Sequence, residues 1–169
     1  MAPFVGNHDV TRFLSEADGD TGDAWSAPPP APTDPRPYES LWLAQTVALT
    51  LPGAPVIYYG DEYGQPGGRD PDNRRAMVFP GDRNALQDET FERIALAGRT
   101  RACSHALRHG RRATVTVEDD LLAYVRDADD GEPALVVIHR GDAPLTKSFT
   151  LPAGALPGDE GTLFDVFSG

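Results

Sequence analysis

The sequence is poor in cysteine: Cys103 is the only one among 169 residues. A single cysteine cannot form an intrachain disulfide, and its isolation excludes a metal site built from two cysteines. Its surroundings, "TRACSHAL", favour a helix, so we expect Cys103 to be a small residue on that helix. The fold must therefore be held by its packed core and its hydrogen bonds.

Basic residues and long apolar runs are also scarce. The chain has 15 Lys and Arg against 26 Asp and Glu, for a net charge of −11. Such a charge repels phosphates and anionic lipids, which excludes nucleic acid and membranes as expected partners and favours a neutral ligand. The longest apolar region, 41–59, is interrupted by polar residues, Pro and Gly, and the first ten residues lack the features of a signal peptide. These absences predict a soluble, cytoplasmic chain.

The first part of the chain has the pattern of a β-α-β unit. A short apolar run at 4–6 predicts a strand, and an almost continuously apolar segment at 38–51 predicts a buried helix. The run "PVIYY" at 55–59 is typical of a strand that is buried on both faces of a parallel sheet. The intervening stretch 15–37 is rich in Asp, Gly and Pro, so we expect a long exposed loop there.

The second part changes from helix to strands. After a loop at 61–88, the pattern predicts a helix over 89–107 with Asp88 as its N-cap. Beyond Arg111 come five short β-type runs separated by acidic, Gly or Pro turns, which is an antiparallel all-β pattern. We therefore expect a domain boundary near 109–112. The runs are "ATVTV", "LLAYVR", "ALVVIH", "KSFTL" and "TLFDV".

Polar residues follow both predicted parallel strands. The triplet Asn7, His8 and Asp9 comes directly after the first strand, and Asp61 and Glu62 follow the second. Functional groups of parallel α/β folds gather at this end of the strands. Taken alone, an Asn-His-Asp triplet is more often a hydrogen-bonded turn. Here, however, both predicted strands end in polar residues and lead into long loops, which favours a binding or catalytic site.

These segments resemble the α-amylase family, glycoside hydrolase family 13. "FVGNHD" at 4–9 is similar to the last signature region of that family, and "LPGAPVIYYGDEYGQPGGRDPDNRRAM" at 51–77 resembles its eighth barrel strand with the flanking segments, in the neopullulanase-like and oligoglucosidase-like form. The resemblance implies an α/β plus all-β fold. Residues 1–110 would be the last two β/α units of a (β/α)8 TIM barrel, and residues 111–169 a small antiparallel β-sandwich, domain C.

The resemblance also implies a reaction. The family cleaves α-glucosidic bonds by a retaining double displacement that uses a nucleophile and an acid/base. Asp9 would be the third carboxylate, which stabilises the transition state, and His8 would hydrogen-bond the same glucose with Asn7 in support. Asp70 and Arg74 would hold the sugar on the non-reducing side, or would simply form an i, i+4 ion pair that steadies the loop.

The family's nucleophile and acid/base lie on its fourth and fifth barrel strands, and neither strand is in this sequence. Asp61 and Glu62 are rejected as substitutes, since neighbouring residues at a strand end point to different faces. We therefore expect this chain to be inactive alone. Its expected partners are an α-glucan or maltooligosaccharide and the missing N-terminal barrel half. No cofactor is expected: the complete enzyme could bind calcium, but no calcium site is visible here.

Two further points stay open at this level. Trp25 and Tyr63 lie in loops and could offer stacking surfaces for sugars, whereas Tyr58 and Tyr59 are more often core or barrel-mouth residues. The alternative to a glycosidase portion is a non-catalytic β-sandwich that binds another protein or carbohydrate and retains a relic barrel segment.

Overall fold

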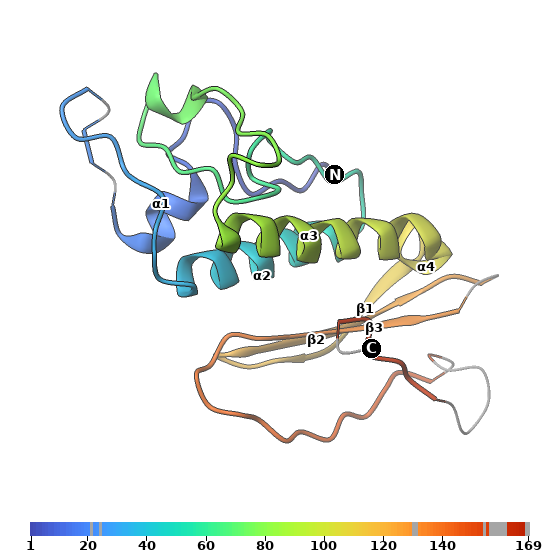
Figure 1. Ribbon diagram of the computed structural model, residues 1–169. Helices are drawn as coiled ribbons and strands as arrows, with labels where there is room; N and C mark the ends of the chain where they lie inside the picture. Colours follow the sequence, from blue (N-terminus) through green and yellow to red (C-terminus); the bar gives the residue numbers. More distant parts are fainter. Residues whose placement is uncertain (21, 24, 130–131, 154, 156–161, 168–169) are drawn as a thin grey trace.

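The structure is a computed structural model that describes residues 1–20, 22–23, 25–129, 132–153, 155 and 162–167. Its helices and N-terminal loops lie on one side of a three-stranded sheet (Figure 1). The two long helices run side by side between the loops and the sheet. Within the described residues, no helix is long and apolar enough to cross a membrane.

The predicted helix after the first loop is confirmed as α2, Arg36–Thr50. It ends where Pro52 and Gly53 follow, as expected for residues that cannot continue a helix. Its apolar side chains enter two clusters, one with Leu14 of the short helix α1, Phe13–Asp18, and one with Ile94 of the next long helix. The expected 15–37 loop is therefore shorter, because its first residues belong to α1.

The second long helix, α3, spans Ala85–Cys103 and begins earlier than predicted. The predicted N-cap, Asp88, is wrong: the cap is Asn84, whose side chain accepts from the backbone N–H of Gln87 at 2.9 Å. The Gln87 side chain in turn accepts from the backbone N–H of Asn84 at 3.1 Å, which completes a capping box. After α3 the chain breaks at Ser104 and continues as α4, His105–His109.

The two predicted parallel strands are only partly realised. Phe4 and Val56 form a single parallel bridge, and the backbone N–H of Val56 donates to Pro3 at 2.9 Å. The order and direction agree with the β-α-β pattern, but the prediction of a strand buried on both faces is wrong for these residues. Val56 is 50% exposed and Phe4 55% exposed, because a strand is buried only where neighbours cover it and the described residues supply just one bridge.

The third part forms an antiparallel sheet in the order β1-β2-β3. Three of the five predicted runs are confirmed, and a bulge interrupts the first pairing between Thr114 and Thr116. The runs at 147–151 and 162–166 are not strands. The described residues thus contain one sheet and no second layer of strands for a sandwich. The strands are β1, Arg111–Val117; β2, Leu121–Asp127; and β3, Ala134–His139.

The sheet is fastened to the helical part by buried contacts. Leu107 packs with Tyr124 and Val136, and the Tyr124 hydroxyl lies 2.6 Å from Thr50 Oγ1 at the end of α2. Arg126 is fully buried and donates to the carbonyl oxygens of Thr50 and Gly110. Helix gives way to strand at residue 110, but the division into domains 1–110 and 111–169 stays a prediction.

The capping box predicts a specific loss of stability. Asn84→Ala removes the acceptor for Gln87, so we expect the free energy of unfolding to fall by about 1 kcal/mol in urea denaturation. Asp88→Ala is the matched control, since Asp88 only adds a charge near the helix start, worth about 0.3 kcal/mol. Equal losses in the two variants would contradict the assignment of Asn84 as the cap.

Candidate functional site

The Asn-His-Asp segment forms a tight turn directly after the parallel bridge. The backbone N–H of Asp9 donates to Asn7 Oδ1 at 2.7 Å, so Asn7 caps the turn. His8 Nε2 lies 3.3 Å from Asp9 Oδ1, and these two side chains are 65% and 70% exposed. Asn7 therefore acts as a hydrogen-bonded cap of the turn, while His8 and Asp9 present their functional groups to solvent.

The predicted pair Asp70 and Arg74 lies next to the Asn-His-Asp turn. Arg74 Nη2 lies 3.1 Å from Asp70 Oδ1, and Arg74 Nε donates to the backbone carbonyl of His8 at 3.2 Å. Both side chains are about half exposed. The expected i, i+4 ion pair thus exists, and the same arginine also reaches the Asn-His-Asp turn. All five sequence-predicted residues lie in two adjoining segments.

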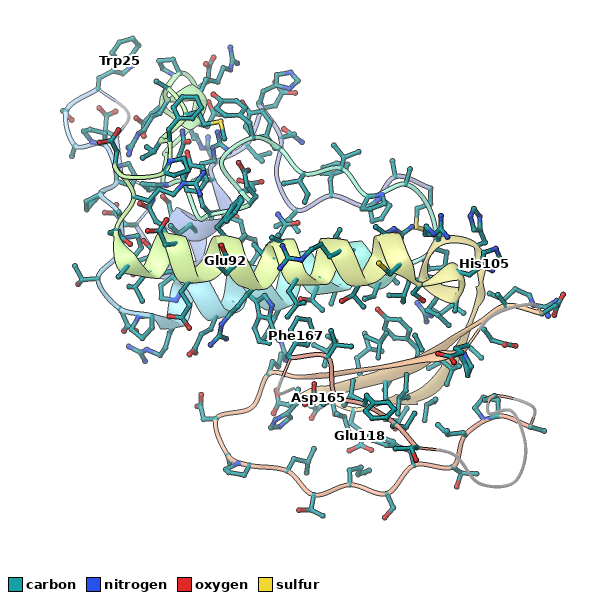
Figure 2. The ribbon with its side chains drawn as sticks, turned by 45° about the vertical axis from the view of Figure 1, so that its right-hand side comes forward. Trp25, Glu92, His105, Glu118, Asp165 and Phe167 are labelled. Carbon is teal, nitrogen blue, oxygen red and sulfur yellow. The ribbon has the colours of Figure 1, made fainter. Side chains whose placement is uncertain are left out.

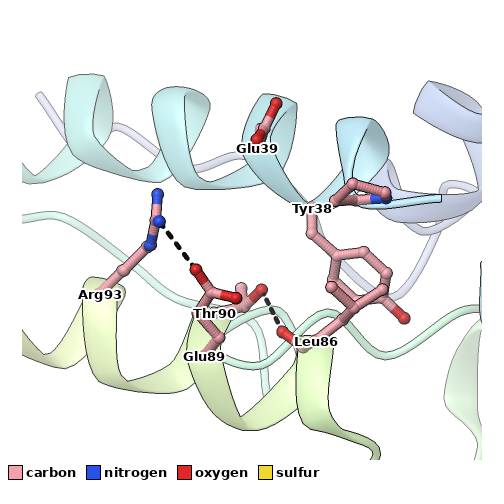
Figure 3. A pocket seen from close by; sticks show the side chains of 7 residues that line it. Tyr38, Glu39, Leu86, Glu89, Thr90 and Arg93 are labelled. Atoms are coloured by element: carbon pink, nitrogen blue, oxygen red, sulfur yellow. Dashed lines mark hydrogen bonds and ion pairs between the residues drawn. The ribbon is translucent and has the colours of Figure 1, made fainter. Parts of the chain in front are cut away.

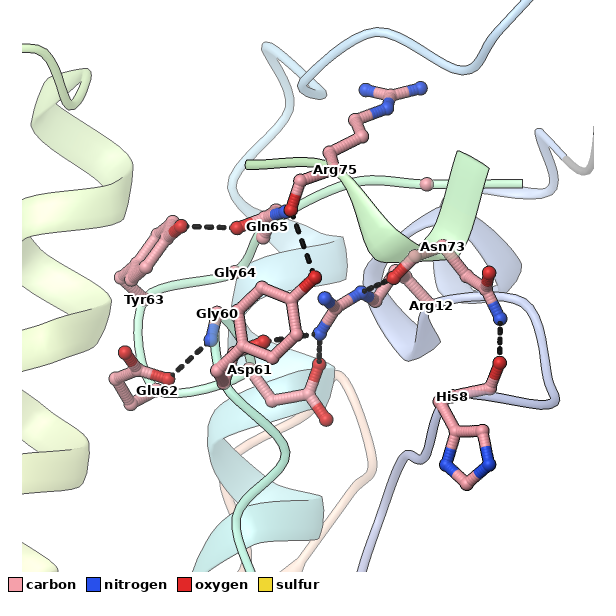
Figure 4. A network of polar contacts seen from close by, with 12 residues as sticks. His8, Arg12, Gly60, Asp61, Glu62, Tyr63, Gly64, Gln65, Asn73 and Arg75 are labelled. Carbon is pink, nitrogen blue, oxygen red and sulfur yellow. Dashed lines mark hydrogen bonds and ion pairs between the residues drawn. The ribbon is translucent and has the colours of Figure 1, made fainter. Parts of the chain in front are cut away.

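Asn73 joins these segments from below the surface, and the sequence analysis missed it. Its side chain is fully buried, and its Nδ2 donates to the carbonyl oxygens of His8, at 2.7 Å, and Val10, at 2.9 Å (Figure 4). The His8 ring points away from this contact. Asn73 belongs to a short 3-10 turn, Asp72–Arg74, where no periodic pattern distinguishes a buried amide from an exposed one.

Arg12 is the centre of the buried network in Figure 4, and it too had no predicted role. It is 1% exposed. Its Nη1 donates to Asp61 Oδ1 at 3.0 Å and to the Tyr59 carbonyl at 2.6 Å, and its Nε donates to the Asn73 carbonyl at 2.8 Å. The guanidinium also stacks on the rings of Tyr58 and Tyr59. One side chain therefore ties together three separate stretches of backbone.

Asp61 and Glu62 have structural roles, in agreement with their rejection as catalytic substitutes. Glu62 accepts from the backbone N–H of Gly60 at 2.7 Å. Asp61 is 2% exposed, and this burial raises its pKa to about 6 although the Arg12 guanidinium opposes the shift. Gly6 lies against the Asp61 carboxylate so closely that any Cβ at this position would collide with it.

The two aromatic candidates for sugar stacking, Tyr63 and Trp25, differ in their exposure to solvent. The suggestion that Tyr63 stacks on sugar is wrong, because its side chain is fully buried, accepts from the backbone N–H of Val78 at 2.8 Å and lies beneath Arg83. Its apolar ring and hydroxyl are both satisfied inside the protein. Trp25 is 80% exposed and projects from the loop between α1 and α2 (Figure 2). Its stacking role stays a prediction.

Two hollows lie elsewhere in the part of the chain that the structure describes. One lies between the starts of α2 and α3 beside Tyr38, Leu86 and Arg93, and its volume of about 30 Å³ has no room for a sugar (Figure 3). A larger, open groove of about 500 Å³ lies beside His105 and His109, at the end of the sheet where β1 begins and β2 ends. Across the described ranges, no group of three or more His, Cys, Asp or Glu side chains is arranged to hold a metal ion.

The buried carboxyl of Asp61 predicts a pH dependence. Its pKa is raised from 3.8 to about 6, so the folded chain binds this proton more tightly than the unfolded chain. The stabilising contribution is full below about pH 4 and is lost as the pH rises through about 6. Relative to Asp61→Asn, the wild type should lose free energy of unfolding over this interval. A constant difference in urea melts would refute it; Asp142→Asn controls for removal of an exposed charge.

Known proteins match this chain in both sequence and structure, although no protein-family model matches. A cyclomaltodextrinase of Geobacillus thermopakistaniensis is 32% identical over 140 residues, which are 82% of this chain and 20% of that protein. An amylopullulanase of Thermoanaerobacter thermohydrosulfuricus is 34% identical over 149 residues, 82% of this chain and 10% of the relative. The chain thus spans about a fifth or less of the curated relatives' length.

Two solved structures agree. The cyclic alpha-maltosyl-(1→6)-maltose hydrolase of Arthrobacter globiformis, in complex with that sugar, superposes with a TM-score of 0.64 at 32% identity, over 82% of this chain and 27% of the other. The alpha-amylase of Geobacillus thermoleovorans, complexed with acarbose, gives a TM-score of 0.63 at 30% identity, over 79% and 26%. Both the sequence and the arrangement of most of the chain therefore follow those of α-glucan-active enzymes.

Proposed function

Because the chain belongs to the α-amylase family, glycoside hydrolase family 13, we propose that it carries the third carboxylate and part of the sugar-binding surface of a retaining α-glucan-active site. The observation that carries this proposal is the convergence of Asp9 and Arg74. Both side chains are solvent-accessible, yet the backbone of one segment is hydrogen-bonded to the other.

The chemistry follows from the charges. The positive charge that develops on the sugar ring in the transition state is stabilised by a carboxylate already held beside it, which is the role proposed for Asp9. His8 would donate a hydrogen bond to the same glucose, and the turn capped by Asn7 would support both. Arg74, paired with Asp70, would donate to hydroxyl groups of the adjoining sugar.

The nucleophile and the acid/base would come from earlier barrel units. We propose that residues 1–110 supply the last two β/α units and residues 111–169 the trailing domain C. The exposed apolar groups at the parallel bridge support this, since Phe4, Val56 and Ile57 offer a surface for further strands of a closed sheet. The neutral substrate would be an α-glucan or maltooligosaccharide, in accord with the acidic chain. Hydrolysis and transfer both remain compatible with this role.

The decisive test is an activity that depends on Asp9. The chain is joined to, or mixed with, the polypeptide that supplies the remaining barrel units, and p-nitrophenol release from an α-linked maltooligosaccharide is measured. We expect activity only in the combined protein and at least a hundredfold loss, about the effect of one electrostatic group, in Asp9→Asn. Asp142→Asn, another exposed carboxylate, should keep full activity. A combined protein that is folded but inert would favour the non-catalytic alternative.

A second prediction separates sugar binding from stability at Arg74. The Arg74–Asp70 pair is about half exposed, and exposed ion pairs contribute at most about 1 kcal/mol. Arg74→Ala should therefore leave the thermal midpoint nearly unchanged but raise KM for maltooligosaccharides in the combined protein. Arg93→Ala removes a comparable exposed pair with Glu89 on α3 and should leave KM unchanged. A large loss of stability with normal KM in Arg74→Ala would show that the pair serves only the loop.

A further inference from the structure

We infer that Arg12 and Asn73 are positioning residues for Asp9: together they fix the backbone on both sides of this carboxylate. Neither residue exposes a group that a substrate could touch, since both side chains are almost completely buried. The inference rests on the proposed function of Asp9 and extends it to a buried layer beneath the site.

The first step is the grip of Asn73 on the turn. The two hydrogens of its amide go to the carbonyl oxygens of His8 and Val10, the residues immediately before and after Asp9. The peptide unit before Asp9 and the peptide unit after Val10 are therefore tied to one rigid, planar group. Rotation about this stretch of backbone, which would swing the Asp9 side chain, breaks at least one of these bonds.

The second step is the anchoring of Asn73 itself. Arg12 Nε donates to the Asn73 carbonyl oxygen, while Arg12 Nη1 holds Asp61 and the Tyr59 carbonyl. The backbone N–H of Arg12 also donates to Gly67 at 3.0 Å. The guanidinium is a rigid planar group with donors in fixed directions. It therefore sets the positions of the Asn-His-Asp turn and of the loop that carries Asn73 relative to residues 59–61, which follow the second predicted strand.

The third step concerns what else could hold Asp9. Its side chain is 70% exposed and lies against the His8 ring, and its backbone N–H donates to Asn7, so these contacts stay within the same turn. From outside the turn, the half-exposed Arg74 adds one bond, to the His8 carbonyl. Contacts inside the turn cannot fix the turn relative to the rest of the site. Asn73 supplies two bonds to the turn from the protein interior, where solvent does not compete. Misplacement of a reacting group by about 1 Å can cost a hundredfold in rate, so the loss of these bonds should impair Asp9.

The experiment compares buried variants in the combined protein. Asn73→Leu removes both donors at similar volume, and Arg12→Lys keeps the charge but loses the planar guanidinium. In each we expect kcat/KM to fall at least about tenfold, mostly through kcat, in samples that circular dichroism shows to be folded. Arg126→Lys is the matched control: Arg126 is equally buried and also donates to two carbonyls, but at the sheet, so kcat/KM should stay within about twofold.

A spectroscopic readout accompanies the kinetics. The His8 imidazole resonances report the contact between its Nε2 and Asp9 Oδ1, so they should shift in Asn73→Leu and Arg12→Lys and stay unchanged in Arg126→Lys. Normal kcat/KM and His8 signals in either folded variant would overturn the inference while Asp9→Asn remains inactive. If activity does not depend on Asp9, the proposed function and this inference both fall. If Asn73→Leu does not fold, Arg12→Lys decides.

Discussion

The buried ion pair between Arg12 and Asp61 is the contact on which the rest of the site depends. An arginine in a dry interior is costly unless its guanidinium finds partners, and here Nε and Nη1 donate to a carboxylate and two carbonyls while the plane lies against two aromatic rings. Those partners come from segments that are far apart in the chain. The contacts of the Arg12 guanidinium therefore bring together the Asn-His-Asp turn, residues 59–61 and the loop that carries Asn73.

The candidate site has an exposed set of residues at the surface and a buried set directly beneath it. Asp9, His8, Asp70 and Arg74 lie at the surface, where their ion pairs are weak and their groups can meet a ligand. Asn73 and Arg12 lie underneath, where solvent cannot compete for their hydrogen bonds. In the proposed site, this separation would leave ligand contact to the exposed residues and geometric control to the buried ones. The exposed ion pairs would then matter more to the proposed sugar binding than to stability.

The sheet is attached to the helical part by a separate set of buried contacts. Its attachment to α2 uses Tyr124, Arg126 and a cluster around Leu107, and Phe167 adds a ring contact of 5.2 Å to Trp42. Arg126 repeats the device of Arg12, a buried guanidinium that caps carbonyl oxygens, but at the end of a helix and far from the polar turn. The same arrangement attaches the sheet in one place and, in our proposal, positions Asp9 in the other.

The sequence by itself determined the two long helices, three of the strands and the family, because apolar periodicity, turn residues and contiguous motifs are local. It also singled out Asp9 and Arg74 as candidate site residues, because they lie within such motifs. Only the tertiary structure decided that Tyr63 is buried, that Val56 is exposed, and that Asn84 begins α3. It also brought Arg12 and Asn73 together, since a hydrogen bond across more than sixty residues leaves no trace in local spacing. Burial and long-range pairing depend on what folds against a residue.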